Sequence, residues 1–215
     1  MRVGVLASGA GTNLQALLDR VHGRDGVEIV AVASDKVDAG ALLRARRAGV
    51  STGTFPLSDY AGRAQRDEAI GEWLSSHEVK LVVLAGYMQL LSAEFLARFS
   101  GRVINVHPAL LPAFPGLRAV EQALAYGVKV FGVTVHFVDE GVDTGPVILQ
   151  RAVEIPDARG PEDVMRRLSP IEHALLPQAV ALIAAGAVRV DPANPRRVLI
   201  GEADAARALR GAGAS

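Results

Sequence analysis

An amide and an imidazole stand two residues apart at the end of an apolar run, residues 102–106. Residues i and i+2 of a strand point to the same side, so Asn105 and His107 can converge on one point. A neutral hydrogen-bond donor beside a titratable one is what an oxyanion forming at a carbonyl carbon requires. Pro108 and Pro112 stiffen the backbone that follows. An ordinary strand end, with a capping Asn and a partly buried His, explains these residues equally well.

A carboxylate that could act with this pair lies in the segment 134–146, which begins as a strand and ends in an acidic loop with glycines. Carboxylates in such loops are usually solvated turn formers. Asp143 differs, because Gly145 and Pro146 lead directly into another apolar strand. A carboxylate held there could keep a neighbouring imidazole protonated and pass protons through water. His136 lies mid-strand and fits a core histidine better than a catalytic one.

The first strand-to-helix turn, residues 8–13, is rich in glycine. Glycines let backbone N–H groups approach an anion, and a helix amino terminus adds a positive dipole end. The dinucleotide fingerprint needs a small residue where Leu14 stands, and the turn lacks the lysine of a P-loop. The turn therefore predicts a site for a mononucleotide phosphate rather than NAD or ATP. The alternative is a plain glycine-rich turn capped by Thr12 or Asn13.

Short apolar runs alternate with amphipathic stretches over the first half of the chain. Strands separated by helices, with near-continuous apolar cores, predict an α/β fold with an open, mostly parallel doubly wound sheet and helices on both faces. The predicted strands are 3–7, 28–33, 54–55, 80–85 and 102–106, and the predicted helices are 13–21, 41–48, 60–76 and a short helix capped by Ser92.

After Pro112 the pattern changes to consecutive strands, 128–138 and 147–155, which predict an antiparallel carboxy-terminal part. One helix follows over 162–185, crossed by Pro170 and Pro177, and 188–190 with 197–200 could form a small hairpin. We expect a single domain, 1–215. Its parts would be a mononucleotide-binding parallel half (1–112), a catalytic-loop half (113–190) and a frayed tail (191–215).

Composition excludes several classes of protein. Lysine plus arginine number 23 against 23 acidic residues, so no overall charge recruits nucleic acid or an anionic membrane. With no cysteine the chain has no disulfide framework and no thiolate nucleophile, and its five histidines show no metal-ligand spacing. The chain shows neither a signal-peptide pattern nor an apolar run that could span a bilayer. We therefore expect a cytoplasmic protein without a metal.

Four long motifs stand in order along nearly the whole chain: SGAGTNLQAL at 8–17, HPALLPAFPG at 107–116, TVHFVDEGVDTGPVILQ at 134–150 and IEHALLP at 171–177. With Asn105, His107 and Asp143 they make the chain resemble the phosphoribosylglycinamide formyltransferases of purine biosynthesis. The resemblance implies transfer of a formyl group from 10-formyltetrahydrofolate, a co-substrate, to the amine of glycinamide ribonucleotide. It makes Asn105, His107 and Asp143 the catalytic residues.

The resemblance also implies two sets of binding residues. Gly11, Thr12, Asn13 and Glu172 would bind the ribonucleotide. Arg63, Met88, Gln89, Leu90, Leu91, Asn105, Asp139 and Glu140 would bind the folate. Two positions depart from the family pattern: Gln89 replaces an expected arginine, and Arg118 with Val120 stand where histidines are expected.

The expected mechanism is direct attack of the ribonucleotide amine on the formyl carbon. Asn105 and protonated His107 would stabilise the oxyanion, and Asp143 would relay the proton to the departing folate nitrogen. The expected partners are small-molecule substrates, with no nucleic acid and no membrane, and the protein would be a monomer or a homodimer.

Several rival functions remain, and one of them is formyl transfer to a nucleotide sugar. A methionyl-tRNA formyltransferase would carry a further carboxy-terminal domain and an excess of basic over acidic residues. A formyl-folate deformylase would carry an amino-terminal regulatory domain. A nucleotide-binding sensor would bind the ribonucleotide without catalysis.

Overall fold

The computed structural model describes residues 1–201. The chain divides into two compact units, Met1–Asn105 and Val106–Ser215. Of the predicted tail, only residues 191–201 are described, and 202–215 lie outside the described residues.

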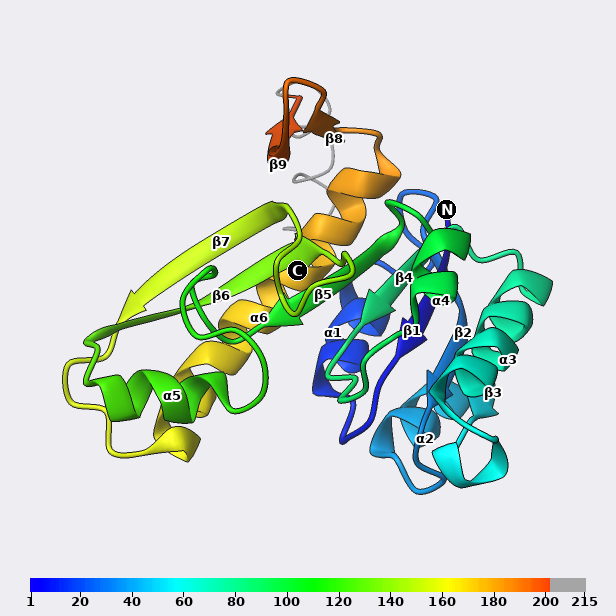
Figure 1. Cartoon of the computed structure of the whole chain (residues 1–215), viewed down its shortest axis with the longest axis horizontal. Helices are drawn as coiled ribbons and strands as arrows, with labels where there is room; N and C mark the ends of the chain where they lie inside the picture. Colours follow the sequence, from blue (N-terminus) through cyan, green and yellow to red (C-terminus); the bar gives the residue numbers. More distant parts are fainter. Residues whose placement is uncertain (202–215) are drawn as a thin grey trace. The chain divides into compact units, whose positions relative to one another are not determined.

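The first unit alternates strands and helices (Figure 1). Its elements are β1 (Arg2–Leu6), α1 (Thr12–Arg20), β2 (Glu28–Ser34), α2 (Gly40–Arg47), β3 (Ser51–Thr54), η1 (Leu57–Asp59), α3 (Arg63–Ser76), β4 (Leu81–Leu84), α4 (Ala93–Arg98) and β5 (Val103–His107), whose last two residues belong to the second unit. The strands pair in parallel in the order β3-β2-β1-β4-β5. The predicted parallel sheet is confirmed.

The strand order makes this sheet doubly wound. The chain moves outward from β1 to β3 and then returns past β1 to β4 and β5. Because parallel crossovers are right-handed, the helices before and after the return lie on opposite faces. The helix contacts agree, since α1 contacts α2 and α3 contacts α4. Burial on both faces explains why β4 is buried at every residue.

The carboxyl ends of the central strands share one edge. Leu6 of β1 stands beside Ala33 of β2 and Leu84 of β4, and Leu84 stands beside Asn105 of β5. The strand order reverses between β1 and β4, and the crevice outside such a switch point is where open α/β sheets bind ligands. The glycine-rich turn follows β1 at this edge.

The second unit contains an antiparallel pair and a long helix (Figure 1). Its elements are α5 (Ala119–Tyr126), β6 (Val130–Phe137), β7 (Val147–Glu154), α6 (Pro161–Ala184), β8 (Val188–Asp191) and β9 (Asn194–Ile200). Strand β6 pairs antiparallel with β7, and α6 packs on both. The predicted antiparallel carboxy-terminal part and the small hairpin, β8 with β9, are confirmed.

Helix α5 is absent from the elements predicted from the sequence. Its sequence, AVEQALAY, contains good helix formers, and Gly127 ends the helix with a φ of 86°. Both are recognisable signals. Within residues 1–201 no helix is long and apolar enough to cross a membrane.

Candidate active site

Strand β5 carries both the predicted amide and the predicted imidazole. The strand continues one residue beyond the predicted end, to His107. Asn105 is partly exposed, whereas His107 is buried. Because side chains alternate along a strand, the two residues project from the same face of β5.

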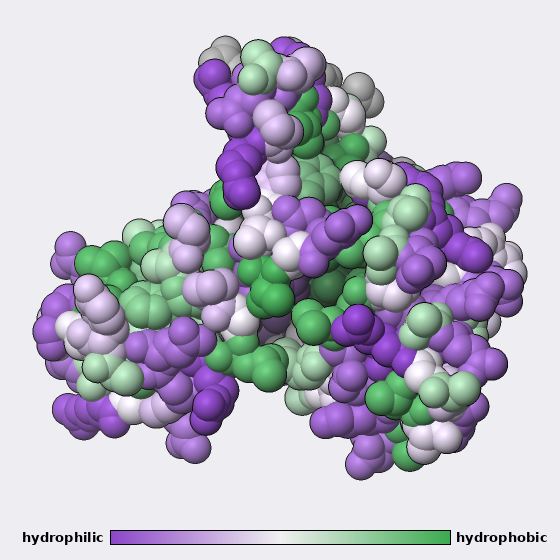
Figure 2. Space-filling view, in the orientation of Figure 1, coloured by the Kyte–Doolittle hydropathy of each residue, from purple (hydrophilic) through white to green (hydrophobic). Residues whose placement is uncertain are grey.

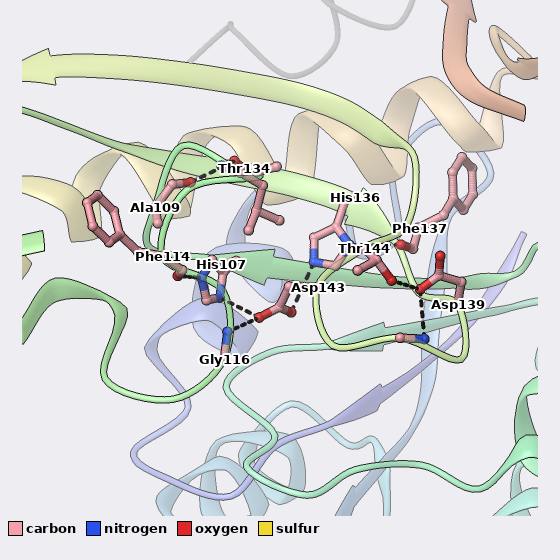
Figure 3. A network of polar contacts seen from close by, with 12 residues as sticks. His107, Ala109, Phe114, Gly116, Thr134, His136, Phe137, Asp139, Asp143 and Thr144 are labelled. Carbon is pink, nitrogen blue, oxygen red and sulfur yellow. Dashed lines mark hydrogen bonds and ion pairs between the residues drawn. The ribbon is translucent and has the colours of Figure 1, made fainter. Parts of the chain in front are cut away.

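The Asp143 carboxylate lies beside His107 in the second unit (Figure 3). Its Oδ2 is 3.3 Å from His107 Nδ1 and accepts a hydrogen bond of 2.8 Å from the Gly116 N–H. The structure therefore brings together the two residues that the sequence places 36 positions apart (143 minus 107). Asp143 adopts a φ of 54°, a left-handed conformation that Asp tolerates better than most residues.

His136 of β6 faces the other carboxylate oxygen. Its Nε2 lies 3.5 Å from Asp143 Oδ1, and its Nδ1 lies 2.8 Å from the Phe137 carbonyl oxygen. The sequence pattern predicted a core histidine at this position. His136 is indeed buried, with 1% of its surface exposed, but it also contacts the candidate catalytic carboxylate. The sequence could have indicated this contact, because the acidic loop that carries Asp143 directly follows β6, the strand that carries His136.

These contacts fix the charge of Asp143. Burial raises the pKa of its carboxyl. The hydrogen bonds from His136 and the Gly116 N–H, together with the charges of His107 and His136, lower this pKa by more, and the net value is about 2. Asp143 is therefore an anion at neutral pH. Each neighbouring imidazole faces this anion and one backbone carbonyl, so a ring with protons on both nitrogens donates to both acceptors.

A segment after β5 folds over His107. The Phe114 carbonyl oxygen lies 2.9 Å from His107 Nε2, while Gly116 donates to Asp143. Phe114, Gly116 and Arg118 all have positive φ, at 54°, 78° and 57°. Left-handed conformations are uncommon for Phe and Arg, so the contacts of this segment must hold them there. Arg118 is exposed at the start of α5.

The acidic loop is organised by Asp139. Its Oδ1 accepts hydrogen bonds from the Gly141 N–H at 3.1 Å and from Thr144 Oγ1 at 2.6 Å (Figure 3). Arg196 of β9 donates to the Thr144 carbonyl at 3.0 Å. The Asp139 side chain thus shapes the loop that presents Asp143, while Glu140 is exposed.

The glycine-rich turn leads into α1 in the first unit. Gly11 has a φ of 75°, and a Cβ there would come within 2.6 Å of the Ala41 backbone, so glycine is required. In the described chain, α1 has neither a side-chain cap at Gly11 nor an acidic residue in its first turn. Ser8 ties the turn to the segment after β4, since its N–H donates to the Gly86 carbonyl and its Oγ accepts from the Met88 N–H.

The segment after β4 combines exposed apolar side chains with a fixed amide. Met88 and Leu90 are each 58% exposed, which is unusual at the end of a buried strand. Gln89 Oε1 accepts a hydrogen bond from Arg66 Nη1 at 3.2 Å, and its Nε2 donates to Asp35 Oδ2 at 3.0 Å. A guanidinium therefore does lie near position 89, but helix α3 supplies it. Arg63, in contrast, is exposed at the start of α3, and Leu91 is partly buried.

Arg66 belongs to a buried charge network that was not predicted from the sequence. Arg66 and Asp67 are 0% exposed and form an ion pair of 2.7 Å, although the outward surface of α3 is hydrophilic (Figure 2). Asp67 also accepts from the Ser92 N–H at 2.7 Å, and Ser92 caps α4 as predicted. Burial raises the pKa of the nearby Tyr87 phenol well above its usual range.

Helix α6 carries the remaining candidate, Glu172. It is buried in the second unit, with 6% of its surface exposed. Between residues 1 and 201, no group of three or more His, Asp or Glu side chains is placed to hold a metal ion.

Comparison with known proteins identifies the family. Residues 1–180 match the model of the formyl transferase family. A phosphoribosylglycinamide formyltransferase of Mycobacterium tuberculosis is 46% identical over 88% of this chain and 87% of its own length. The crystal structure of glycinamide ribonucleotide transformylase 1 from Symbiobacterium toebii superposes with a TM-score of 0.89 at 47% identity, covering 94% of both chains.

A more distant neighbour is a formyltetrahydrofolate deformylase from Pseudomonas syringae pv. tomato, at 26% identity and a TM-score of 0.85, covering 94% of this chain and 66% of that one. The family model alone spans most of the described residues. This chain belongs to the formyl transferase family and is a formyltransferase.

Proposed function

We propose that the enzyme transfers the formyl group of 10-formyltetrahydrofolate to the amine of N1-(5-phospho-D-ribosyl)glycinamide in purine biosynthesis. The observation that carries the proposal is the Asp143 carboxylate held against the His107 imidazole at the end of β5. The names of the relatives, all at 38% identity or more over most of this chain, support the same substrate and the same pathway.

In the proposed reaction the neutral amine attacks the formyl carbon, and negative charge develops on the formyl oxygen. Asn105 and protonated His107 donate hydrogen bonds to this oxygen. The ionised Asp143 carboxylate lies 3.3 Å from His107 Nδ1, where it balances the positive charge of a protonated ring. No covalent intermediate is required, because the amine is itself the nucleophile.

A proton must also travel from the attacking amine to the folate nitrogen that leaves. Asp143 accepts and returns this proton, through a water molecule where the distance requires one. His107 Nε2 already has a hydrogen-bond partner, the Phe114 carbonyl oxygen at 2.9 Å. This nitrogen can reach the formyl oxygen only if the segment around Phe114 moves away when substrates bind.

The substrate contacts follow the chemistry of each segment. The turn at Gly11, Thr12 and Asn13 would bind the ribonucleotide phosphate, because backbone N–H groups at a helix start attract anions. Glu172 would accept hydrogen bonds from the ribonucleotide. The folate would contact the exposed apolar segment after β4 (Met88, Gln89, Leu90 and Leu91), with Arg63, Asn105, Asp139 and Glu140.

The test is the absorbance of the folate band, followed with and without the ribonucleotide. We expect the band to change only when both substrates are present, and to remain constant in His107→Gln. His77→Gln is the matched control, since His77 lies at the end of α3, and it should retain the wild-type rate. A normal rate in His107→Gln would contradict the assigned role of His107.

The second candidate is hydrolysis of the formyl folate, which the deformylase neighbour makes worth testing. Loss of the formyl group without any acceptor amine would identify a deformylase. We expect less than about a hundredth of the transfer rate, because water must then replace a positioned amine. A cytoplasmic location and a monomeric or homodimeric state stay predictions.

A further inference from the structure

Helix α2 donates hydrogen bonds to two backbone carbonyls of the glycine-rich turn. The Ala41 N–H donates to the Gly9 carbonyl at 3.1 Å. Arg44 Nε donates to the Ala10 carbonyl at 2.9 Å. Two successive carbonyls of the turn therefore point toward α2, and one of them is bound by a charged side chain.

The direction of these carbonyls sets the direction of the next N–H groups. In a planar trans peptide, the C=O of one residue and the N–H of the next point in opposite directions. The Ala10 and Gly11 N–H groups must consequently point away from α2. Successive N–H groups on one side of a turn form a concavity that binds anions.

Arg44 is itself held in place by α1. Its Nη1 donates to Gln15 Oε1 at 3.0 Å, and Gln15 Nε2 donates to Asp19 Oδ1 at 2.8 Å one turn later. The guanidinium thus links α2, the turn and the first helix. It lies partly buried in a groove of about 550 Å³ between α1 and α2, which Arg47 also lines.

We infer that Arg44 is a positioning residue for phosphate binding: it fixes the Ala10–Gly11 peptide so that its N–H faces the phosphate of a mononucleotide. The inference rests on the proposed function for the identity of that mononucleotide. Arg44 binds the carbonyl side of the peptide, so its effect reaches the phosphate through the backbone. A charge-assisted hydrogen bond to a carbonyl is among the stronger ones available for this purpose.

Two alternative roles for Arg44 lead to different expected results. A purely structural Arg44 would affect thermal stability without affecting phosphate affinity. A general electrostatic role would be shared by Arg47, which belongs to the same helix and the same groove. Arg44→Met keeps the length of the side-chain stem while removing its donors, and Arg47→Met makes the same change at the control position.

The experiment measures steady-state kinetics and melting temperature for the full chain and its variants. In Arg44→Met we expect the KM for the ribonucleotide to rise about tenfold, as for loss of one such hydrogen bond, while kcat and the KM for 10-formyltetrahydrofolate change less than about twofold. Arg44→Lys should recover part of the loss, because an ammonium can still donate to Ala10. Arg47→Met should behave like the wild type.

A second readout follows the backbone amides of Ala10 and Gly11 by NMR during titration with ribose 5-phosphate. We expect both amides to shift in the wild type and in Arg47→Met, and to shift less in Arg44→Met. Shifts with ribose 5-phosphate but no formyl transfer would refute the proposed function and leave this inference standing. The inference fails if the wild-type amides do not respond, if Arg47→Met raises the KM equally, or if Arg44→Met changes only the melting temperature.

Discussion

Two polar networks, one in each unit of this protein, differ in burial and in the residues that carry their charge. In the first unit Arg66 and Asp67 form an ion pair at 0% exposure. In the second unit Asp143 stands between two imidazoles and keeps 14% of its side chain exposed. The first network connects α3 to the segment after β4, whereas the second connects the ends of two strands to the acidic loop.

The difference fits a structural role for the first network and the catalytic role that we propose for the second. Arg66 and Asp67 exchange hydrogen bonds with each other and with backbone or amide groups around them, and their burial keeps water and substrates away. A buried ion pair costs desolvation energy, so its retention points to a role in specifying the geometry of Gln89 and Ser92. The partly exposed Asp143 can still exchange a proton with a ligand or with water, which is what catalysis requires.

The largest effect should come from Asp143→Asn. The amide keeps the size of the side chain but removes the charge and the proton-accepting oxygen, so we expect kcat to fall about a thousandfold. Rapid-mixing measurements of formyl transfer at saturating substrates would check this. The melting temperature should change by only a few degrees, and unaltered turnover would contradict a proton role for Asp143.

Arg66→Met should have the opposite effect, a large loss of stability with little change in activity. This change leaves the Asp67 carboxylate buried without its cation, and we expect the free energy of unfolding to fall by about 3–5 kcal/mol. Urea unfolding would measure the loss, and kcat per folded molecule should change less than about threefold. In Arg66→Met with Asp67→Asn, which removes both charges but keeps an acceptor for the Ser92 N–H, we expect part of the stability to return. No recovery in the double variant would mean that packing, not charge, is lost.

The two networks also differ in how far the sequence predicts them. Asn105, His107 and Asp143 stand next to strand ends, and a strand end places its side chains at one edge, so local pattern was enough to single them out. His136 was undervalued because its contact with Asp143 depends on how the acidic loop returns to β6. Arg66 gave no local signal: on the helix it resembles any surface arginine, and its partner Gln89 is 23 residues away.

The fold could be predicted from the sequence more completely than the site, because hydrophobic periodicity directly indicates which residues are buried. The predicted strands of the parallel sheet and of the antiparallel pair are all present, with ends shifted by a few residues. Helix α5 was not predicted because the residue before it, Arg118, has a positive φ and provides no side-chain cap to mark its start. The roles of the site residues depend on how substrates sit against them, which hydrophobic periodicity does not report, so these roles stay predictions.

A moderate effect is expected for His136→Gln. Glutamine can keep a donor toward Asp143 but cannot carry the positive charge, so the carboxylate loses part of what lowers its pKa. We expect kcat to fall about tenfold, which is less than the hundredfold or more typical of a group that transfers the proton itself. His136→Phe should cost considerably more stability, since it leaves Asp143 and the Phe137 carbonyl without this donor. Equal kinetics in the wild type and His136→Gln would restrict His136 to a packing role.

The smallest effect concerns the acid stability of the second network. The pKa of Asp143 in the folded protein, about 2, lies below its ordinary value of 3.8, so the unfolded chain binds more protons between these two pH values. The stability that Asp143 contributes is therefore complete above about pH 4 and is lost as the pH falls through about 2. Urea midpoints measured at pH 5, 4 and 3 should decline less steeply in Asp143→Asn than in the wild type. Because Arg66 and Asp67 remain in both proteins, the difference between their two curves of urea midpoint against pH reports on the second network alone. Parallel curves would mean that the contacts of His107 and His136 with Asp143 do not hold its carboxylate ionised in solution.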